Sequence, residues 1–367
     1  MKSQNRKAFT LVEIMAASVI MTLIVLGVLI ITTNILNTWS RASGQLQTYF
    51  DAAVVGSIIQ EDFESIKIRK DGRAWLQVAY PQSVGLLTGE DDMDSVPLRP
   101  PEIMFYSPTM LRPRYTREHM QDATGDAATA DQNSGSICAI KYQLSLKSPF
   151  MDSSSNPADN ESQYNAFYGL YRAVIDPKST ALEAMGSTIQ GYTTSPDGED
   201  FRDALAQNLW AGTCTIVDEE GVEQPGTDLK SWVLAPENLL VNSMVDFRVT
   251  FAVFYPNPDA TPGSGENDYK LAYIPAGTPF TVGPRILTEG AYEFVNGSRN
   301  PVDPRLLEDG YLAFADFSMT LISDAGAKEI RALAMNGTLT QESFKRLVLA
   351  HGNTVVRRIQ FMAEPGE

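Results

Sequence analysis

Residues 6–31 read "RKAFTLVEIMAASVIMTLIVLGVLII": two basic residues, a short apolar start, and one glutamate at the edge of a long apolar run. No charged side chain lies between Ile14 and Ser40. A helix rises about 1.5 Å per residue, so about 20 apolar residues cross a bilayer. The run therefore predicts one membrane-spanning helix. Glu13 needs an explanation, because an acidic group at the centre of such a helix costs about 2.5–3.5 kcal/mol on insertion scales.

The charges that flank the apolar run predict its orientation. Lys2, Arg6 and Lys7 precede the run, and Arg41 is the first charged residue after it. Because basic residues are retained on the cytoplasmic side, the N-terminus is expected in the cytoplasm. The remainder is then periplasmic or extracellular, and the protein is expected in the inner membrane with a single span.

Three interpretations of this segment compete. A cleaved secretory signal has a shorter apolar core and a small-residue cleavage site, and here only "RASGQ" (41–45) follows a core that is too long. A permanent signal anchor explains the length, but it accounts for Glu13 only if the carboxylate lies at the level of the lipid headgroups. A prepilin leader explains the basic residues, the small residue Ala8 and Glu13 together.

The segment resembles the class III leader of type IV prepilins and type II secretion pseudopilins, in which a short basic leader and a small residue precede Phe-Thr-Leu-x-Glu. The resemblance implies that a prepilin peptidase cuts between Ala8 and Phe9 and N-methylates Phe9. Glu13 is then the fifth residue of the mature chain. The family usually has glycine where this sequence has Ala8, which is also small.

The resemblance also implies a role for Glu13 in filament assembly. Cleavage leaves an ammonium group on Phe9 at the membrane boundary, and an unpaired charge is heavily penalised in a medium of low dielectric constant. The carboxylate of Glu13 offers a partner, within the chain or to a neighbouring subunit. In the family's model the glutamate recruits the N-terminus of the adjacent subunit. The implied partners are prepilin peptidase, other pilin or pseudopilin subunits, and inner-membrane lipid.

The helix is expected to continue beyond the membrane. Apolar or small residues recur at helical spacing at Ala42, Leu46, Tyr49, Ala52, Gly56, Ile59, Phe63 and Ile66. A helix over residues 9–66 would be about 87 Å long at 1.5 Å per residue, with its second half packed on a globular domain. A juxtamembrane coiled coil would need sustained heptads, and the pattern breaks at "IRKDGR" (68–73).

The remaining chain predicts an α+β domain with a mainly antiparallel β-sheet. Strands are expected at 74–80, 137–146, 167–175, 245–255, 311–322 and 354–362. Helices are expected at 200–210 and 340–350, where Thr340 and Glu342 suit a helix start. Long polar loops are expected at 121–136, 151–162 and 256–268. The expected organisation is pilin-like: a leader (1–8), the membrane half of a long helix (9–38), its extracytoplasmic half (39–70), and a globular domain with long loops (71–367).

Within the superfamily the chain is most similar to the J-type minor pseudopilins of type II secretion. The residues that carry this likeness are "IIQEDFESI" (58–66), "LLVNSMVDFRVTFAVFY" (239–255), "LAFADFSMTLISDAG" (312–326) and "VVRRIQFM" (355–362). A J-type protein is considerably shorter. In its size and in the stretch "GSICAIKYQL" (135–144) the chain also resembles the enlarged prepilin-like proteins of the Verru_Chthon cassette C type. The K-type minor pseudopilins are similar in size, but they typically lack the glutamate that Glu13 supplies.

Composition argues against several other classes of protein. The formal charge of −16 disfavours a nucleic-acid partner, which needs a basic face. Two cysteines and two histidines, all isolated, do not form a zinc motif, and no HExxH, GxSxG or phosphate-loop pattern is present. No cofactor is expected.

Two further groups of residues are candidate sites. Cys138 and Cys214 are expected to form a disulfide or to remain as two buried thiols, and the sequence favours neither. The acidic run "EDDMD" holds four carboxylates that suit calcium but lack the EF-hand spacing, so a solvated loop is the alternative. The carboxylates belong to Glu90, Asp91, Asp92 and Asp94.

The sequence therefore predicts a non-enzymatic, leader-processed structural subunit of a type IV pilus-like or type II secretion pseudopilus filament, present at low copy near a tip. The alternative is an anchored surface-binding protein or adhesin that uses its enlarged loops. An anchored hydrolase ranks third, because no nucleophile and base can be paired from the sequence.

Overall fold

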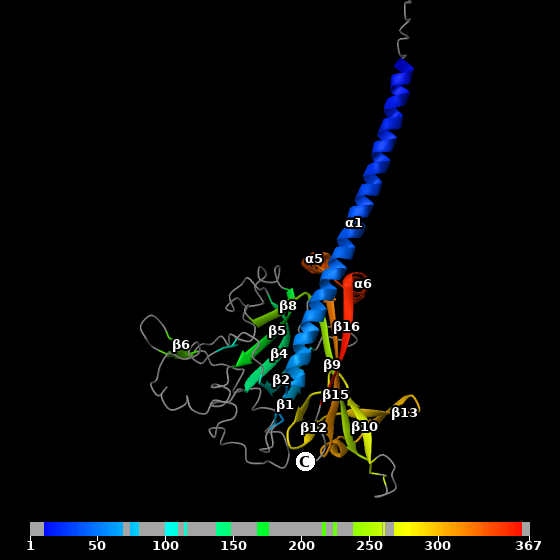
Figure 1. Ribbon diagram of the computed structural model, residues 1–367. Coiled ribbons are helices and arrows are strands. Elements are labelled where there is room, and N and C mark those ends of the chain that lie inside the picture. Colours follow the sequence, from blue (N-terminus) through cyan, green and yellow to red (C-terminus); the bar gives the residue numbers. More distant parts are fainter. Residues whose placement is uncertain are drawn as a thin grey trace, which may run out of the picture.

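The computed structural model describes residues 11–68, 74–80, 100–108, 114–115, 137–147, 167–175, 215–217, 223–225, 238–258, 260 and 268–361. Its dominant element is helix α1 (Leu11–Glu64), whose 54 residues extend about 80 Å. One half projects away from the rest of the protein, and the other half lies against β-sheets (Figure 1). The continuous helix predicted from the sequence is confirmed over the described residues.

The first large sheet has eight strands in the order β12-β11-β1-β2-β4-β5-β3, with β8 also paired to β5. Its strands are β1 (Leu76–Ala79), β2 (Glu102–Ser107), β3 (Arg114–Tyr115), β4 (Cys138–Lys147), β5 (Phe167–Ile175), β8 (Leu239–Asn242), β11 (Phe280–Val282) and β12 (Ile286–Thr288). The pairing of β3 with β5 is parallel, and the other pairs described in this sheet are antiparallel.

The second large sheet has six antiparallel strands in the order β14-β13-β10-β9-β15-β16. Its strands are β9 (Met244–Pro256), β10 (Tyr269–Ile274), β13 (Ala291–Val295), β14 (Ser298–Val302), β15 (Tyr311–Ile322) and β16 (Gly352–Gln360). A separate two-stranded sheet joins β6 (Thr215–Val217) and β7 (Glu223–Pro225). The mixed α+β fold is confirmed, with two large sheets.

The six predicted strands correspond to β1, β4, β5, β9, β15 and β16, and the ranges of β5 and β15 agree with the prediction at both ends. The predicted helix at 340–350 is α6 (Gln341–His351), and the side chain of Thr340 caps its N-terminus. The predicted helix at 200–210 and the loops at 121–136 and 151–162 lie outside the described residues. Helix α5 (Asp324–Met335) and the short 3-10 helix η5 (Pro304–Leu307) were not predicted.

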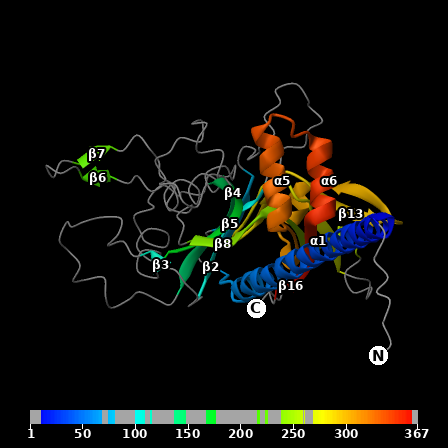
Figure 2. The same cartoon turned by 90° about the horizontal axis from the view of Figure 1, so that it is seen from above.

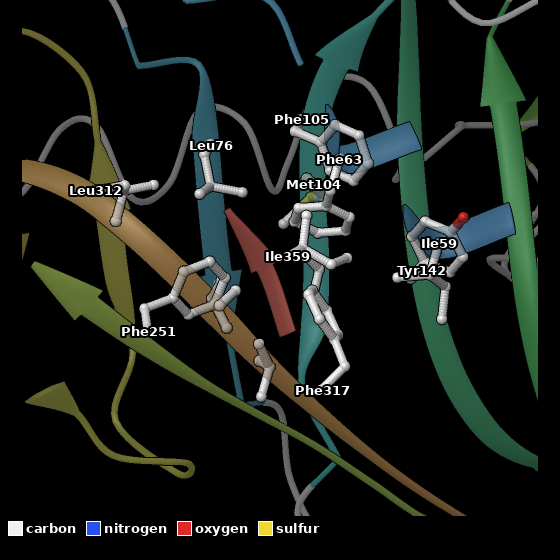
Figure 3. Packing of buried hydrophobic residues seen from close by; sticks show 14 of the residues in the cluster. Ile59, Phe63, Leu76, Met104, Phe105, Tyr142, Phe251, Leu312, Phe317 and Ile359 are labelled. Atoms are coloured by element: carbon white, nitrogen blue, oxygen red, sulfur yellow. The ribbon is translucent and has the colours of Figure 1, made fainter. Parts of the chain in front are cut away.

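One hydrophobic core joins α1 to both large sheets, and Phe63 lies at their junction (Figure 3). The ring centroid of Phe63 is 4.4 Å from that of Phe105 on β2 and 4.7 Å from that of Phe317 on β15. The rings of Phe251 and Phe280 lie 4.6 Å apart and connect β9 to β11. The second half of α1 is thus an internal layer of the fold.

Helices α5 and α6 form a hairpin beside α1, at the end of the globular part nearest to the projecting half of the helix (Figure 1). The hairpin rests on a small second core, to which Ile330 of α5 and Leu347 of α6 contribute buried side chains. Figure 2 shows both helices lengthwise when the protein is viewed from above. The hairpin therefore lies across this end of the domain.

Candidate functional site

The projecting half of α1 has the dimensions of a membrane span. Met15–Leu36 comprises 22 apolar-rich residues, about 33 Å of helix, and is the one candidate span among the described residues. Its large apolar side chains are exposed. The hydroxyl groups of Ser18, Thr22 and Thr33 donate to backbone carbonyls three or four residues earlier, so these polar groups are satisfied within the helix.

The predicted processing and assembly residues fall at the start of this segment. Glu13 lies within α1, on the N-terminal side of Met15–Leu36. Ala8 and Phe9 lie outside the described residues. Cleavage, methylation and the role of Glu13 in assembly therefore stay predictions at this point.

The other half of α1 presents one face to the domain. Thr48, Ala52, Val55, Ile59 and Phe63 are buried, in steps of three and four residues. The close approach begins at Gly44, where an added Cβ would lie 3.2 Å from the Cβ of Ser323.

The predicted helix face was wrong in its first turns. Leu46 is 60% exposed and Tyr49 is 55% exposed. At about 100° per residue, Leu46 points about 120° away from Ala52, which is at the centre of the buried face. An apolar residue in this part of α1 is therefore not necessarily a core residue of its own domain.

A buried ion pair fixes the end of α1 to the eight-stranded sheet. The carboxylate of Asp62 is fully buried, and Arg172 of β5 is 3% exposed. Arg172 donates from Nε to Oδ2 at 2.7 Å and from Nη2 to Oδ1 at 2.8 Å, which is a bidentate contact. The hydroxyl group of Tyr142, on β4, also donates to Oδ2. One helix and two strands therefore converge on a single carboxylate.

The electrostatics of this cluster oppose its separation. Burial raises the pKa of Tyr142, and the nearby Asp62 charge raises it further. Burial would lower the pKa of Arg172, but hydrogen bonds and charge interactions with Asp62 and Tyr142 outweigh burial and raise that pKa. Arg172 and Asp62 depend on each other, because an unpaired buried charge is strongly unfavourable.

Sequence reasoning missed this cluster, although a local signal was present. Asp62 lies three residues after Ile59 and next to Phe63, so it is an acid on the buried face of the helix. A carboxylate in that position needs a partner. Arg172 is 110 residues away in the sequence, and no local pattern connects the two.

Residues 3–29 match the prokaryotic N-terminal methylation motif. The matched range contains Ala8, Phe9 and Glu13 and continues into the projecting half of α1. The chain thus carries a type IV prepilin-like class III leader followed directly by a helix suited to a membrane anchor. No curated protein and no solved structure gives a significant match to the chain.

The other predicted sites are only partly within the described residues. Cys138 is buried at the start of β4, while Cys214 lies outside the described part, so their pairing stays a prediction. The acidic run at 90–94 also lies outside it. Within the part of the chain that the structure describes, no group of three or more His, Cys, Asp or Glu side chains is arranged to hold a metal ion.

Proposed function

We propose that the protein is a membrane-anchored, leader-processed minor subunit of a type IV pilus-like or type II secretion pseudopilus filament. Prepilin peptidase cuts between Ala8 and Phe9, and Phe9 becomes the methylated N-terminus. Glu13 then pairs with the terminal ammonium group of a neighbouring subunit. The role is structural and involves no catalysis. The J-type minor pseudopilins are the nearest functional class.

The observation that carries this proposal is the continuity of the methylation motif with α1. The motif at residues 3–29 leads into a helix of 54 residues. One half of this helix exposes apolar side chains, and the other half packs in the hydrophobic core. A cleaved secretory signal would separate the anchor from the domain. Here the anchor and the core element belong to the same helix.

The proposed arrangement places residues 1–8 in the cytoplasm as a leader and residues 9–38 in the inner membrane. Residues 39–70 then continue the helix outside the cytoplasm and join the globular part at 71–367. The basic residues before the span support this orientation. Inner-membrane lipid, prepilin peptidase and other pilin or pseudopilin subunits are the proposed partners.

The decisive test replaces Glu13 with alanine in a strain that expresses the partner subunits. We expect cleavage and membrane insertion to persist, because removing a charge from an apolar helix favours insertion. Incorporation into sheared filaments should fall more than a hundredfold, since unpairing a desolvated charge costs about 3–5 kcal/mol and about 1.4 kcal/mol is tenfold in affinity.

The matched control is Glu61→Ala, which removes an exposed carboxylate from the same helix outside the predicted span. It should be incorporated like the wild type. Normal incorporation of a cleaved Glu13→Ala protein would contradict the assembly role. A wild-type protein that is absent from filaments but retained at the cell surface on a ligand would favour the adhesin alternative.

A further inference from the structure

The six-stranded sheet has aromatic side chains on the face that points away from the core. In the strand register Tyr292 of β13 lies opposite Tyr273 of β10. Tyr273 and Phe314 of β15 both lie opposite Ala252 of β9, the strand between them. Because side chains alternate along a strand, Ala252 and its partners point to the face opposite the buried Phe251. These rings therefore form a line across the strands.

The rings contact one another and stay open to solvent. The ring centroid of Tyr273 is 5.7 Å from that of Tyr292, 5.5 Å from that of Phe294 and 6.1 Å from that of Phe314. Phe294 is 52% exposed. We call Tyr273, Tyr292, Phe294 and Phe314 the aromatic row. Strands β10 and β13 lie at the end of the globular part farthest from the projecting half of α1 (Figure 1).

An arginine flanks the aromatic row on each edge strand. The guanidinium carbon of Arg299, on β14, is 4.9 Å from the ring centroid of Tyr292 and 5.9 Å from that of Phe294. The guanidinium carbon of Arg358, on β16, is 4.0 Å from the ring centroid of Phe314. Both arginines are exposed. Each is thus a cation placed over an aromatic ring.

The two arginines differ in their ionic partners. Arg358 forms a bidentate contact with Asp316 of the neighbouring strand. Arg299 makes no ion pair with any residue that the structure describes. The other two charged groups on this face, Asp246 and Arg248, pair with each other at 2.9 Å. Arg299 is consequently the one charge on this face without an opposite charge beside it, within the described residues.

The remaining carboxylates at this end of the sheet lie off the aromatic row. Asp268, Glu289 and Asp309 lie in turns, three to five residues along the chain from the nearest row residue. That is about 10–16 Å at about 3.3 Å per residue, beyond a Debye length of about 8 Å. Glu293 accepts a hydrogen bond from Tyr255 on the core side of the sheet, and Asp303 accepts one where it caps η5. The surroundings of Arg299 therefore favour an anionic group.

The shape of the aromatic row limits what can occupy it. Six strands about 4.8 Å apart make the row and its arginines about 24 Å long, and two residues along a strand make it about 7 Å wide. The area, about 170 Å², is far below the ~800 Å² that each partner buries in a stable protein–protein interface. A narrow line of rings suits an extended chain.

The charges select among extended chains. A single-stranded nucleic acid has a negative charge on every nucleotide and needs a basic groove, whereas this face has one unpaired cation. A saccharide chain stacks the C–H faces of its sugar rings on aromatic rings. The carboxylate of a uronate residue matches the planar guanidinium group of an arginine.

We propose that the aromatic row binds a linear saccharide chain that contains uronate residues. The sugar rings stack on Tyr273, Tyr292 and Phe294, and Arg299 donates hydrogen bonds to a uronate carboxylate. Binding at this face does not depend on the proposed role in a filament. It gives the globular part an affinity for an acidic polysaccharide.

The test measures binding of hyaluronate oligosaccharides to the full-length protein in detergent micelles by isothermal titration calorimetry. The same oligosaccharides after reduction of their carboxyl groups to alcohols are the neutral counterpart. We expect the wild type to bind hyaluronate more tightly than the reduced form. Added salt should reduce this difference, because it screens the charge of Arg299.

Two variants separate stacking from charge. Arg299→Gln should weaken hyaluronate binding about tenfold and leave the reduced oligosaccharide unaffected, because it removes a hydrogen bond to a charged group. Phe294→Leu keeps an apolar side chain but removes the ring, so it should weaken binding of both oligosaccharides. Arg248→Gln and Val356→Ala are the matched controls, since both residues are exposed on the same face outside the row. Both controls should bind like the wild type.

Several results would overturn the saccharide site. These are a wild type that binds neither oligosaccharide, equal affinity for the acidic and the reduced form, and unchanged binding by Arg299→Gln or Phe294→Leu. Tighter binding of a single-stranded oligonucleotide than of hyaluronate would assign the aromatic row to nucleic acid instead. A photo-crosslinker at position 294 that reacts with another protein of the filament would assign it to a protein.

Discussion

Neutralising Asp62 should weaken the attachment of α1 to the eight-stranded sheet. In Asp62→Asn the side chain keeps its size but loses its charge, and Arg172 remains as a buried cation that is 3% exposed. Breaking a buried pair by removing one partner costs about 3–5 kcal/mol. For a domain of this size, such a loss lowers the melting temperature by on the order of 10 °C.

The protein supplies a matched control for this experiment. Asp316 on β15 and Arg358 on β16 form the same bidentate contact, at 2.7 and 2.8 Å, but their side chains are 27% and 56% exposed. Asp316→Asn should cost no more than about 1 kcal/mol, because solvent screens an exposed pair. The arginine–carboxylate contact has the same geometry in both pairs, so the difference between the two variants measures the effect of burial together with the hydrogen bond that Tyr142 donates to Asp62.

Urea unfolding of the full-length protein in detergent micelles gives both free energies. The combined variant Asp62→Leu, Arg172→Met and Tyr142→Phe should recover most of the loss, because an apolar replacement leaves no unpaired buried group. A cost below about 1 kcal/mol for Asp62→Asn, equal to that of Asp316→Asn, would refute the reasoning.

Four further predictions follow from other parts of the chain. Mass spectrometry of the mature protein should find N-methylated Phe9, with a formal charge of −19, since the leader carries three of the 29 Lys and Arg residues and no acid; an intact leader would contradict it. Phe63→Ala should cost about 3–5 kcal/mol in urea unfolding, because it removes the ring at the junction of α1 and both sheets, and a cost near zero would contradict that packing. Burial raises the pKa of Tyr80 from 10.0 to about 12. The neutral Tyr80 side chain therefore stabilises the folded state below pH 10, and this stabilisation is lost as the pH rises toward 12. In unfolding measurements Tyr80→Phe should lose less stability than the wild type between pH 10 and 12, and equal losses would contradict the raised pKa. An added Cβ at Gly326 would lie 2.5 Å from the Cβ of His351, so Gly326→Ala should loosen the α5–α6 hairpin and speed hydrogen exchange in α5, whereas unchanged exchange would show that the neighbours yield.

The strands that were predicted correctly are those whose residues form a long continuous apolar run. The strands β5 and β15 were placed correctly because long runs of aromatic and β-branched residues define them. The shorter strands β13 and β14 were missed, although Asn296 and Gly297 between them have φ values of 53° and 80°. This pair is a strong hairpin signal, because both residues of such a turn need positive φ.

The candidate site was predictable only at its N-terminal end. The leader and Glu13 form a contiguous pattern, which a motif can describe. The ion pair of Asp62 and Arg172 is made by residues far apart in the sequence, so it exists only once the helix and the sheet have met. Leu46 was misplaced for a related reason, because helical spacing cannot say whether an apolar face meets its own domain, lipid or another molecule.

The second half of α1 has one buried face and one exposed apolar face on opposite sides of the helix. The buried face that includes Ala52, Val55 and Ile59 carries the globular domain, while the exposed apolar residues Leu46 and Phe50 lie on the other side of the same helix. The sheets lie on the side of α1 opposite these exposed residues, and the ion pair between Asp62 and Arg172 joins the helix to the eight-stranded sheet. Any assembly built through α1 would therefore keep its helices at the centre and display the globular domain on the periphery.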